Sequence, residues 1–175
     1  MNLKNVSLIK NKLGKYLKDK DILDVILFGS VIKGKSSPSD IDIAMITQKE
    51  IKADISGFHI SVLKPEDFFV SPSSLVNTLL REGFSIKSER FFSEKYKFLN
   101  RVMFVYELKD LNPSIKVKIV NILRGKKNTM SLVKERGGRW VANRVFVVPI
   151  NEEHIFERIF LNFKVKFNKF YILIH

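Results

Sequence analysis

The sequence predicts an α+β protein built from two units, and three observations support this prediction. Short apolar runs that favour strands alternate with amphipathic stretches of helical period along the 175 residues. The hydrophobic fraction of 45% is large enough to bury a core. The charge is uneven: residues 1–95 carry 15 Lys+Arg and 12 Asp+Glu, whereas residues 96–175 carry 16 and 6. We therefore expect one domain over 1–95 and a second, basic domain over 96–175.

The first domain is predicted to be a short mixed sheet flanked by helices. An N-terminal amphipathic helix is indicated by apolar residues at steps of three and four, namely Leu3, Val6, Ile9, Leu13 and Leu17. Runs of strand-forming residues predict strands over 22–28, 41–46 and 57–63. Helical segments are expected at 31–35, 65–69 and 73–81, and Gly83 has the position of a C-cap after the last of them.

The second domain is predicted to be a small α+β module of a different kind. The stretch from Phe91 to Leu111 is expected to bridge the two domains. Beyond it the pattern predicts, in order, helices over 113–123 and 130–136, a β-like run over 140–148, a helix over 152–163 and a strand over 170–174. Helix, helix and two-stranded element is the order of a winged helix, so we expect a winged-helix-like module.

Composition excludes several classes of protein. The chain has no cysteine and only 3 histidines, which argues against a disulfide scaffold, a zinc finger or a thiol nucleophile. The first twenty residues carry scattered lysines rather than the apolar core of a signal peptide, and no run approaches the ~20 apolar residues that span a bilayer. We expect a cytoplasmic protein without a membrane segment.

The motif that carries chemistry lies between the first two predicted strands. The first strand ends in Gly29-Ser30 at the start of a helical turn, where backbone N–H groups and a hydroxyl can hold a phosphate. Ten residues later Asp40 and Asp42 stand at i and i+2, so on a strand both carboxylates project from one face. Two adjacent carboxylates favour a divalent cation, and oxygen ligands suit Mg²⁺. Lys33 and Lys35 follow the Gly-Ser pair and are candidates to assist in nucleotide binding.

The segment from Asp24 to Ile46 resembles the signature of the polymerase beta nucleotidyltransferase superfamily, in particular its minimal nucleotidyltransferases of archaea and bacteria. The resemblance extends over residues 1 to about 90, and the later region is more vaguely similar to C-terminal extensions of some archaeal members. It implies an α/β sandwich-like nucleotidyltransferase core. It also implies that Gly29 and Ser30 hold the triphosphate of an NTP, and that Asp40 and Asp42 are catalytic residues that bind two Mg²⁺ ions.

The predicted third strand departs from the family's pattern. Catalytic members carry a third carboxylate on this strand, but residues 58–63 contain no acid. If Phe58, Ile60 and Val62 face the core, His59 and Ser61 occupy the side where the carboxylate is expected. Other acids lie nearby in the sequence: Asp54 has the position of a loop residue, and Glu66 and Asp67 have that of a helix start.

The basic residues of the second domain gather in one stretch. Residues 116 to 144 contain a single acid, Glu135, and nine cations. The cations are Lys116, Lys118, Arg124, Lys126, Lys127, Lys134, Arg136, Arg139 and Arg144. Such a stretch is typical of a nucleic-acid-binding surface, either RNA or DNA. The alternative is that these side chains only solvate a small domain. Trp140 is expected to pack in the core or wing rather than to stack on bases.

Two functions of different classes remain open at this point. One is an enzyme that uses Mg²⁺ to transfer a nucleoside monophosphate from an NTP to a hydroxyl of RNA, of a protein such as a toxin, or of a small molecule. The other is a catalytically degenerate protein of the same fold that acts as a nucleic-acid-binding or antitoxin-like interaction module. The intact Gly-Ser and Asp-x-Asp pairs favour the enzyme, and the missing third carboxylate favours the binding protein.

Overall fold

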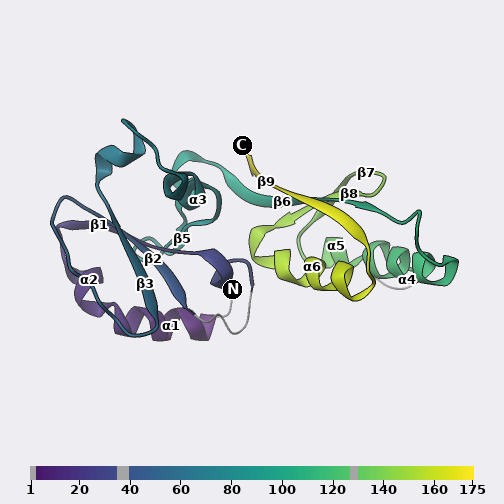
Figure 1. The fold of residues 1–175 in the computed structure, drawn as a ribbon, viewed down its shortest axis with the longest axis horizontal. Helices are drawn as coiled ribbons and strands as arrows, with labels where there is room; N and C mark the ends of the chain where they lie inside the picture. The colour runs from purple at the N-terminus through teal and green to yellow at the C-terminus, as the bar shows by residue number, and fades with distance from the viewer. Residues whose placement is uncertain (1–2, 35–39, 127–129) are drawn as a thin grey trace. The chain divides into compact units, whose positions relative to one another are not determined.

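The computed structural model describes residues 3–34, 40–126 and 130–175, and it forms two compact units (Figure 1). Unit 1 comprises the chain up to Leu99 together with His175, and unit 2 comprises Asn100–Ile174. That the predicted domains 1–95 and 96–175 fold separately stays a prediction. No helix in the described parts of the chain is both long and apolar enough to cross a membrane.

Unit 1 is a five-stranded mixed sheet with helices, as predicted. Its strands are β1 (Ile22–Phe28), β2 (Ile41–Thr47), β3 (Phe58–Leu63), β4 (Phe84–Ser85) and β5 (Arg90–Phe91). Its helices are α1 (Leu3–Lys12), α2 (Gly14–Lys18) and α3 (Ser74–Glu82), with 3-10 turns η1 (Gly29–Val31), η2 (Pro65–Phe68) and η3 (Phe92–Tyr96). The strand order is β3-β2-β1-β4-β5; β2 pairs antiparallel with β1 and parallel with β3.

The two central strands are buried on both faces because helices cover the sheet from both sides. Ile26 and Ala44 pack on one face with Leu79 of α3. The alternate residues Val25 and Ile43 are fully buried on the opposite face, where α1 and α2 lie (Figure 1). This double burial explains why both strands have nearly continuous apolar sequences rather than strict alternation.

Gly83 is needed for space rather than for an unusual backbone conformation. It caps α3 as predicted, but its φ is −70°, outside the left-handed region of a typical glycine cap. A Cβ at Gly83 would lie 2.7 Å from Cγ2 of Ile26, so a side chain here would force α3 away from β1. The glycine therefore permits the close packing of α3 on the sheet.

A buried carboxylate joins three segments of unit 1. Asp24 in β1 is 3% exposed, and its Oδ1 accepts hydrogen bonds from Ser85 Oγ at 2.7 Å and Val25 N at 2.8 Å. Lys95 Nζ of η3 lies 2.6 Å from its Oδ2. These contacts satisfy the charge of Asp24 within the protein and connect β1 to β4 and η3.

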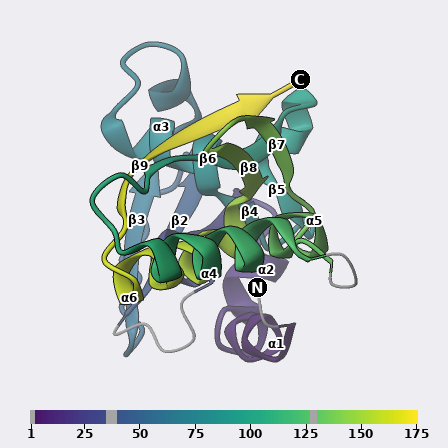
Figure 2. The same ribbon diagram turned by 90° about the vertical axis from the view of Figure 1, so that its right-hand side faces the viewer.

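Unit 2 contains a second sheet and three helices. Its strands are β6 (Leu99–Glu107), β7 (Arg139–Ala142), β8 (Val145–Pro149) and β9 (Lys166–Ile174), in the order β7-β8-β6-β9. Its helices are α4 (Pro113–Arg124), α5 (Leu132–Glu135) and α6 (Glu153–Asn162), with the 3-10 turn η4 (Ile150–Glu152). The helices lie on one side of this sheet (Figures 1 and 2).

Two predictions for unit 2 were wrong in detail, and a third becomes more specific. The β-like run over 140–148, predicted as a two-stranded element, is the hairpin of β7 and β8, in which the chain turns at Arg144 with a φ of 61°. The stretch 91–111 is not only a bridge, since β6 lies at the centre of the second sheet, where Val102 and Phe104 are fully buried. The helix over 130–136 is shorter, because Ser131 is its N-cap and the backbone leaves the helix at Arg136.

The winged-helix module is not confirmed. The order α4, α5 and β7–β8 hairpin is present, but α5 has only 4 residues. In addition, α6 and β9 are part of the fold, and Phe156 and Phe160 of α6 pack in the same core as Phe104 and Phe146. Helix α6 thus contributes a large share of the aromatic core that supports the sheet.

An ion-pair cluster joins β9 to α6. Lys169 Nζ lies 2.6 Å from Glu153 Oε1 and 2.8 Å from Glu157 Oε1, and Tyr171 donates a hydrogen bond to Glu153. Burial alone lowers the pKa of Lys169, but the hydrogen bonds to Glu153 and Glu157 outweigh it and raise the pKa above its usual range. Glu153 is 1% exposed, so it depends on Lys169 to neutralise its charge.

Lys169→Met is expected to destabilise unit 2 by about 2 kcal/mol at pH 7, because it leaves Glu153 charged and buried. Since the folded-state pKa is raised, the contribution of Lys169 is fully present below its unfolded pKa of about 10.4 and disappears as pH rises through the folded value. Urea unfolding should therefore show the same loss at pH 7 and pH 9. The control is Lys166→Met on the same strand, which removes an exposed pair with Asp110 and should have no measurable effect. Equal effects of both substitutions would contradict the prediction.

Candidate active site

The Gly-Ser pair forms a tight turn at the end of β1. Gly29 has a φ of +75°, which favours glycine, and its carbonyl accepts hydrogen bonds from Ile32 N at 3.2 Å and Lys33 N at 3.4 Å. Ser30 lies within η1 and is half-buried. The turn is therefore a short helical segment that begins directly after a buried central strand, as the sequence predicts.

Asp42 lies against this turn. In the antiparallel pairing of β1 and β2, Phe28 is opposite Asp42, which places the carboxylate beside Gly29. A Cβ built on Gly29 would lie 3.3 Å from Asp42 Cγ and closer still to Oδ2, so only glycine leaves room for the carboxylate. The side chain of Asp42 is 32% exposed and thus reaches solvent at the edge of the site. The turn predicted to bind a phosphate and the carboxylate of Asp42 are therefore adjacent in the fold.

Asp40 lies one residue outside the strand. Strand β2 begins at Ile41, and Asp40 precedes it in a bend and is exposed. Of the two aspartates, only Asp42 is therefore a strand residue. The prediction that both lie on a strand holds for Asp42 alone. Because Asp40 stands at the entrance of β2, its carboxylate remains at the same end of the sheet as the Gly-Ser turn.

His59 occupies the position next to Asp42 on β3. The parallel pairing of β2 and β3 places His59 opposite Asp42, and His59 Nδ1 lies 3.3 Å from Asp42 Oδ1. Ser61 is opposite Ala44, one pair farther along the same face, and is half-buried. Val62, on the strand face opposite His59 and Ser61, is 39% exposed, because β3 is an edge strand of the sheet.

The other nearby acids have structural partners or stand in a loop. Asp67 accepts a hydrogen bond from Lys64 N at 2.8 Å as part of a capping box, and Glu66 accepts one from Gln48. Asp54 is exposed between β2 and β3. Across residues 3–34, 40–126 and 130–175 there is no group of three His, Cys, Asp or Glu side chains arranged to hold a metal ion. Asp40 and Asp42 therefore have no third carboxylate among the residues described.

Lys33 forms an ion pair that the sequence did not reveal. Its Nζ lies 3.1 Å from Glu82 Oε2 at the end of α3, and Glu82 is 2% exposed. Arg81 Nη2 lies 3.6 Å from the same oxygen. A carboxylate in the last turn of a helix interacts unfavourably with the helix dipole. The position of Glu82 at the end of α3 was therefore the one feature of the sequence that indicated a tertiary partner for this residue. Lys35, the second candidate lysine, lies outside the described residues.

The nine cations of the second domain are distributed over several elements. Lys116, Lys118 and Arg124 lie on α4, and Lys126 follows this helix. Lys134 lies on α5, Arg139 on β7 and Arg144 in the hairpin turn. Arg136 is 3.6 Å from Glu152, and Lys127 lies outside the described residues. The structure brings Arg124 and Lys134 together at one pocket, and none of the other cations in this set that the structure describes lines it.

The turn, the neighbouring aspartate strand and the mixed sheet together define a nucleotidyltransferase fold. Comparison with known families agrees with this class: residues 11–68 match the model described as polymerase beta, nucleotidyltransferase. Residues 11–68 within unit 1 are therefore similar to a nucleotidyltransferase domain of the polymerase beta superfamily. The match includes Gly29, Ser30, Asp40 and Asp42, and unit 2 lies outside it. No curated protein and no solved structure was found to match the chain.

Proposed function

We propose that this protein transfers a nucleoside monophosphate from an NTP to a hydroxyl group and releases pyrophosphate. The observation that carries this proposal is the contact between Gly29 and Asp42. A phosphate held by the Gly29-Ser30 turn would lie beside a carboxylate that can hold a divalent cation, and a cation between the two anions is what metal-assisted phosphoryl transfer uses. The fold itself implies a nucleotide substrate.

In the proposed reaction the chain mainly positions the NTP. The backbone of the Gly29-Ser30 turn and the Ser30 hydroxyl hold the phosphates, so that the acceptor oxygen can attack the α-phosphorus. The new bond joins this oxygen to the α-phosphorus, and the bond from the α-phosphorus to the bridging oxygen breaks, so that pyrophosphate leaves. As the oxygen attacks, the acceptor's proton passes to solvent water.

The oxygen donors of the site fit Mg²⁺. Proteins commonly hold this ion through one or two carboxylates together with the substrate's phosphates, so a third carboxylate is not required for binding. Asp42 would hold the ion next to the turn, with Asp40 as the second ligand. When bound, the ion would neutralise charge on the triphosphate. The phosphates of the NTP would thus supply the Mg²⁺ ligands that Asp40 and Asp42 alone do not provide.

A second function is favoured by a specific observation. His59 stands opposite Asp42 where catalytic members of the family carry an acid, and β3 has no carboxylate. This favours a degenerate site that binds an NTP without transferring it, in a protein that acts as a nucleic-acid-binding or interaction module. The acceptor of an active enzyme would be RNA, a protein or a small molecule.

The test compares transfer and binding in the same full-length protein. Wild type and Asp42→Asn are incubated with α-³²P-labelled NTPs, Mg²⁺ and candidate acceptors. Transfer is measured as ³²P on the acceptor, and the unlabelled pyrophosphate that is released is measured separately. Asp42→Asn should reduce transfer by about 100-fold, because it removes a charge that would hold the ion and thereby balance the phosphates. The matched control Asp54→Asn removes an equally negative but exposed loop residue and should keep full transfer.

Each outcome separates the two functions. Transfer that depends on Asp42 supports the enzyme. NTP binding that needs Mg²⁺ and Asp42, without transfer to any acceptor, supports the degenerate site and overturns the enzyme. If neither wild type nor Asp42→Asn binds an NTP, both functions of this site are overturned.

A further inference from the structure

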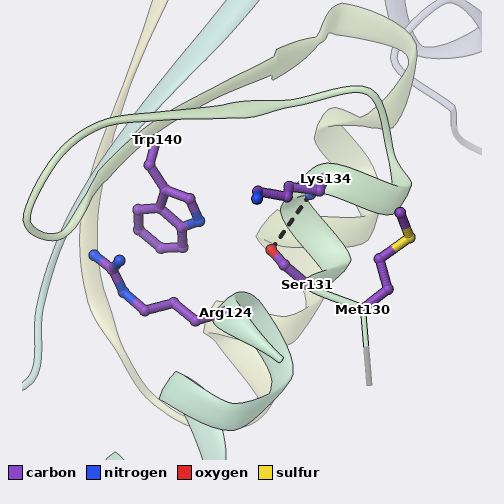
Figure 3. A pocket seen from close by; sticks show the side chains of 5 residues that line it. All are labelled: Arg124, Met130, Ser131, Lys134 and Trp140. Carbon is purple, nitrogen blue, oxygen red and sulfur yellow. Dashed lines mark hydrogen bonds between the residues drawn. The ribbon is translucent and has the colours of Figure 1, made fainter. Parts of the chain in front are cut away.

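Unit 2 contains a pocket that is lined by cationic, polar and aromatic side chains. The pocket has a volume of about 470 Å³ and lies between the end of α4, the start of α5 and β7 (Figure 3). It is lined by two cations, a hydroxyl, a thioether and the sole tryptophan of the chain, namely Arg124, Lys134, Ser131, Met130 and Trp140. The side chains of Arg124, Lys134 and Trp140 surround a common space in Figure 3.

The cationic wall of the pocket is held in a defined orientation. The guanidinium of Arg124 stacks on Trp140, with its carbon 3.8 Å from the ring centroid. Trp140 in turn packs against Phe146, 5.2 Å between centroids, and against the edge of Tyr106. Burial raises the pKa of Tyr106, while the charge of Arg124 and its hydrogen bond to Tyr106 act in the opposite direction. The contacts with Trp140 and Tyr106 therefore hold the Arg124 side chain in one orientation.

Among the residues that the structure describes, neither Arg124 nor Lys134 is neutralised by an ion pair, although the exposed Glu135 follows Lys134 on α5. Five of the carboxylates of unit 2 pair with cations elsewhere: Glu107 with Lys109, Asp110 with Lys166, Glu152 with Arg136, and Glu153 and Glu157 with Lys169. In the described part of the chain no ion pair includes Arg124 or Lys134. Two unneutralised cations that line one pocket form a site for an anion such as a phosphate.

The apolar part of the lining indicates what the phosphate is attached to. The Arg124–Trp140 stack offers a flat surface on which a base can lie, and Met130 is 69% exposed and adds an apolar contact. Ser131 forms part of the pocket wall. Its hydroxyl donates a hydrogen bond to Leu123 O of α4 at 2.5 Å and accepts one from Lys134 N of α5, so it links the two helices. The lining thus combines phosphate-binding and base-stacking groups.

We propose that this pocket binds one nucleotide of a single-stranded nucleic acid, with its phosphate between Arg124 and Lys134 and its base against the Arg124–Trp140 stack. A base within a duplex is paired and stacked, and it cannot enter a pocket without being flipped out. Helix α5, with 4 residues, is too short to lie along a major groove. The proposal is independent of the transfer reaction, because binding at this pocket requires neither an NTP nor a metal ion.

The sole tryptophan reports on its own pocket. The full-length protein is titrated at low salt with short single-stranded oligo(dT) and oligo(U), and the fluorescence of Trp140 is recorded. We expect saturable quenching by single strands and at least tenfold weaker binding of a duplex of equal length. A preference for oligo(U) or oligo(dT) would assign the strand as RNA or DNA. Unchanged fluorescence, or duplex binding as tight as that of the single strand, would overturn the proposal.

Charge-matched variants locate the binding. Lys134→Gln leaves the Arg124–Trp140 stack in place and should weaken binding about tenfold, with the slope of log K against log salt reduced by about one. Arg124→Gln, measured with a labelled oligonucleotide because it alters the surroundings of Trp140, should weaken binding by at least as much. The control Lys109→Gln removes one exposed positive charge elsewhere in unit 2 and should change affinity less than twofold. Thermal melts confirm that each variant is folded, and an equal loss with Lys109→Gln would contradict the proposal.

Discussion

Gly29→Ala is expected to reduce nucleotidyl transfer by about 100-fold or more, while unit 1 remains folded. A Cβ at this position overlaps the carboxylate of Asp42, which must move away from the Gly-Ser turn. A displacement of about 1 Å of a group that positions substrate is sufficient for a loss of this size. The φ of +75° adds a cost of about 1–2 kcal/mol to the folded state. Transfer and NTP binding are measured together with the melting temperature.

Gly57→Ala is the matched control for this substitution. Gly57 has a φ of +82°, but a Cβ there meets no atom within 4 Å. It therefore carries the same backbone cost without the overlap with a carboxylate. We expect Gly57→Ala to lower the melting temperature as much as Gly29→Ala does and to keep full transfer. If the two variants lose activity equally, backbone strain rather than the position of Asp42 explains the effect.

Asp24→Asn is expected to destabilise unit 1 by about 3 kcal/mol. The substitution removes the negative charge that Lys95 approaches to 2.6 Å. The amide oxygen of Asn can still accept the hydrogen bonds from Ser85 Oγ and Val25 N, but its NH2 group then faces the Lys95 ammonium, and two donors cannot pair. Removing one partner of a buried pair is costly because the other is left uncompensated, although Lys95 is 32% exposed and regains some hydration. For a unit of this size the melting temperature should fall by about 10 °C or more.

Asp21→Asn is the control for Asp24→Asn. Asp21 precedes the same strand and pairs with Lys49, but its side chain is 57% exposed, so its loss should have no measurable effect on stability. NTP binding by the Asp24→Asn protein, measured well below its melting temperature, should equal that of wild type because Asp24 lies far along β1 from the Gly-Ser turn. A melting temperature within about 2 °C of wild type would contradict the structural role of Asp24.

The strands of unit 1 were predictable because each is specified locally. Residues 22–28 and 41–46 are apolar runs, each interrupted by one aspartate, that end at a glycine or begin after a polar loop, and the structure has β1 and β2 at these positions. Strand β6 was missed because its apolar residues 102–106 lie within a stretch that mixes aromatic and charged residues. The β7–β8 hairpin was predicted as a two-stranded element, but its turn was not located, because the turn at Arg144 contains neither glycine nor proline.

The candidate sites depended more strongly on long-range contacts. The Gly-Ser turn and the two aspartates could be chosen from spacing alone, because a turn and a strand have fixed local geometry. The ion pair of Lys33 with Glu82 could not be predicted, since it joins segments whose separation in the chain carries no periodic signal. Trp140 was expected to pack in the core or wing. It does pack there, and it also lines the pocket with Arg124.

The sequence by itself determined that this protein has an α+β fold with a nucleotidyltransferase domain, and which residues form its turn and its Asp-x-Asp pair. These features are local, because hydrophobic period and turn chemistry depend on neighbouring residues. Only the tertiary structure decided that Asp42 fills the space beside Gly29, that His59 lies opposite Asp42, and that Arg124 and Lys134 share a pocket. Strand register and the packing of distant segments determine these contacts, and a single sequence does not encode them in any local pattern.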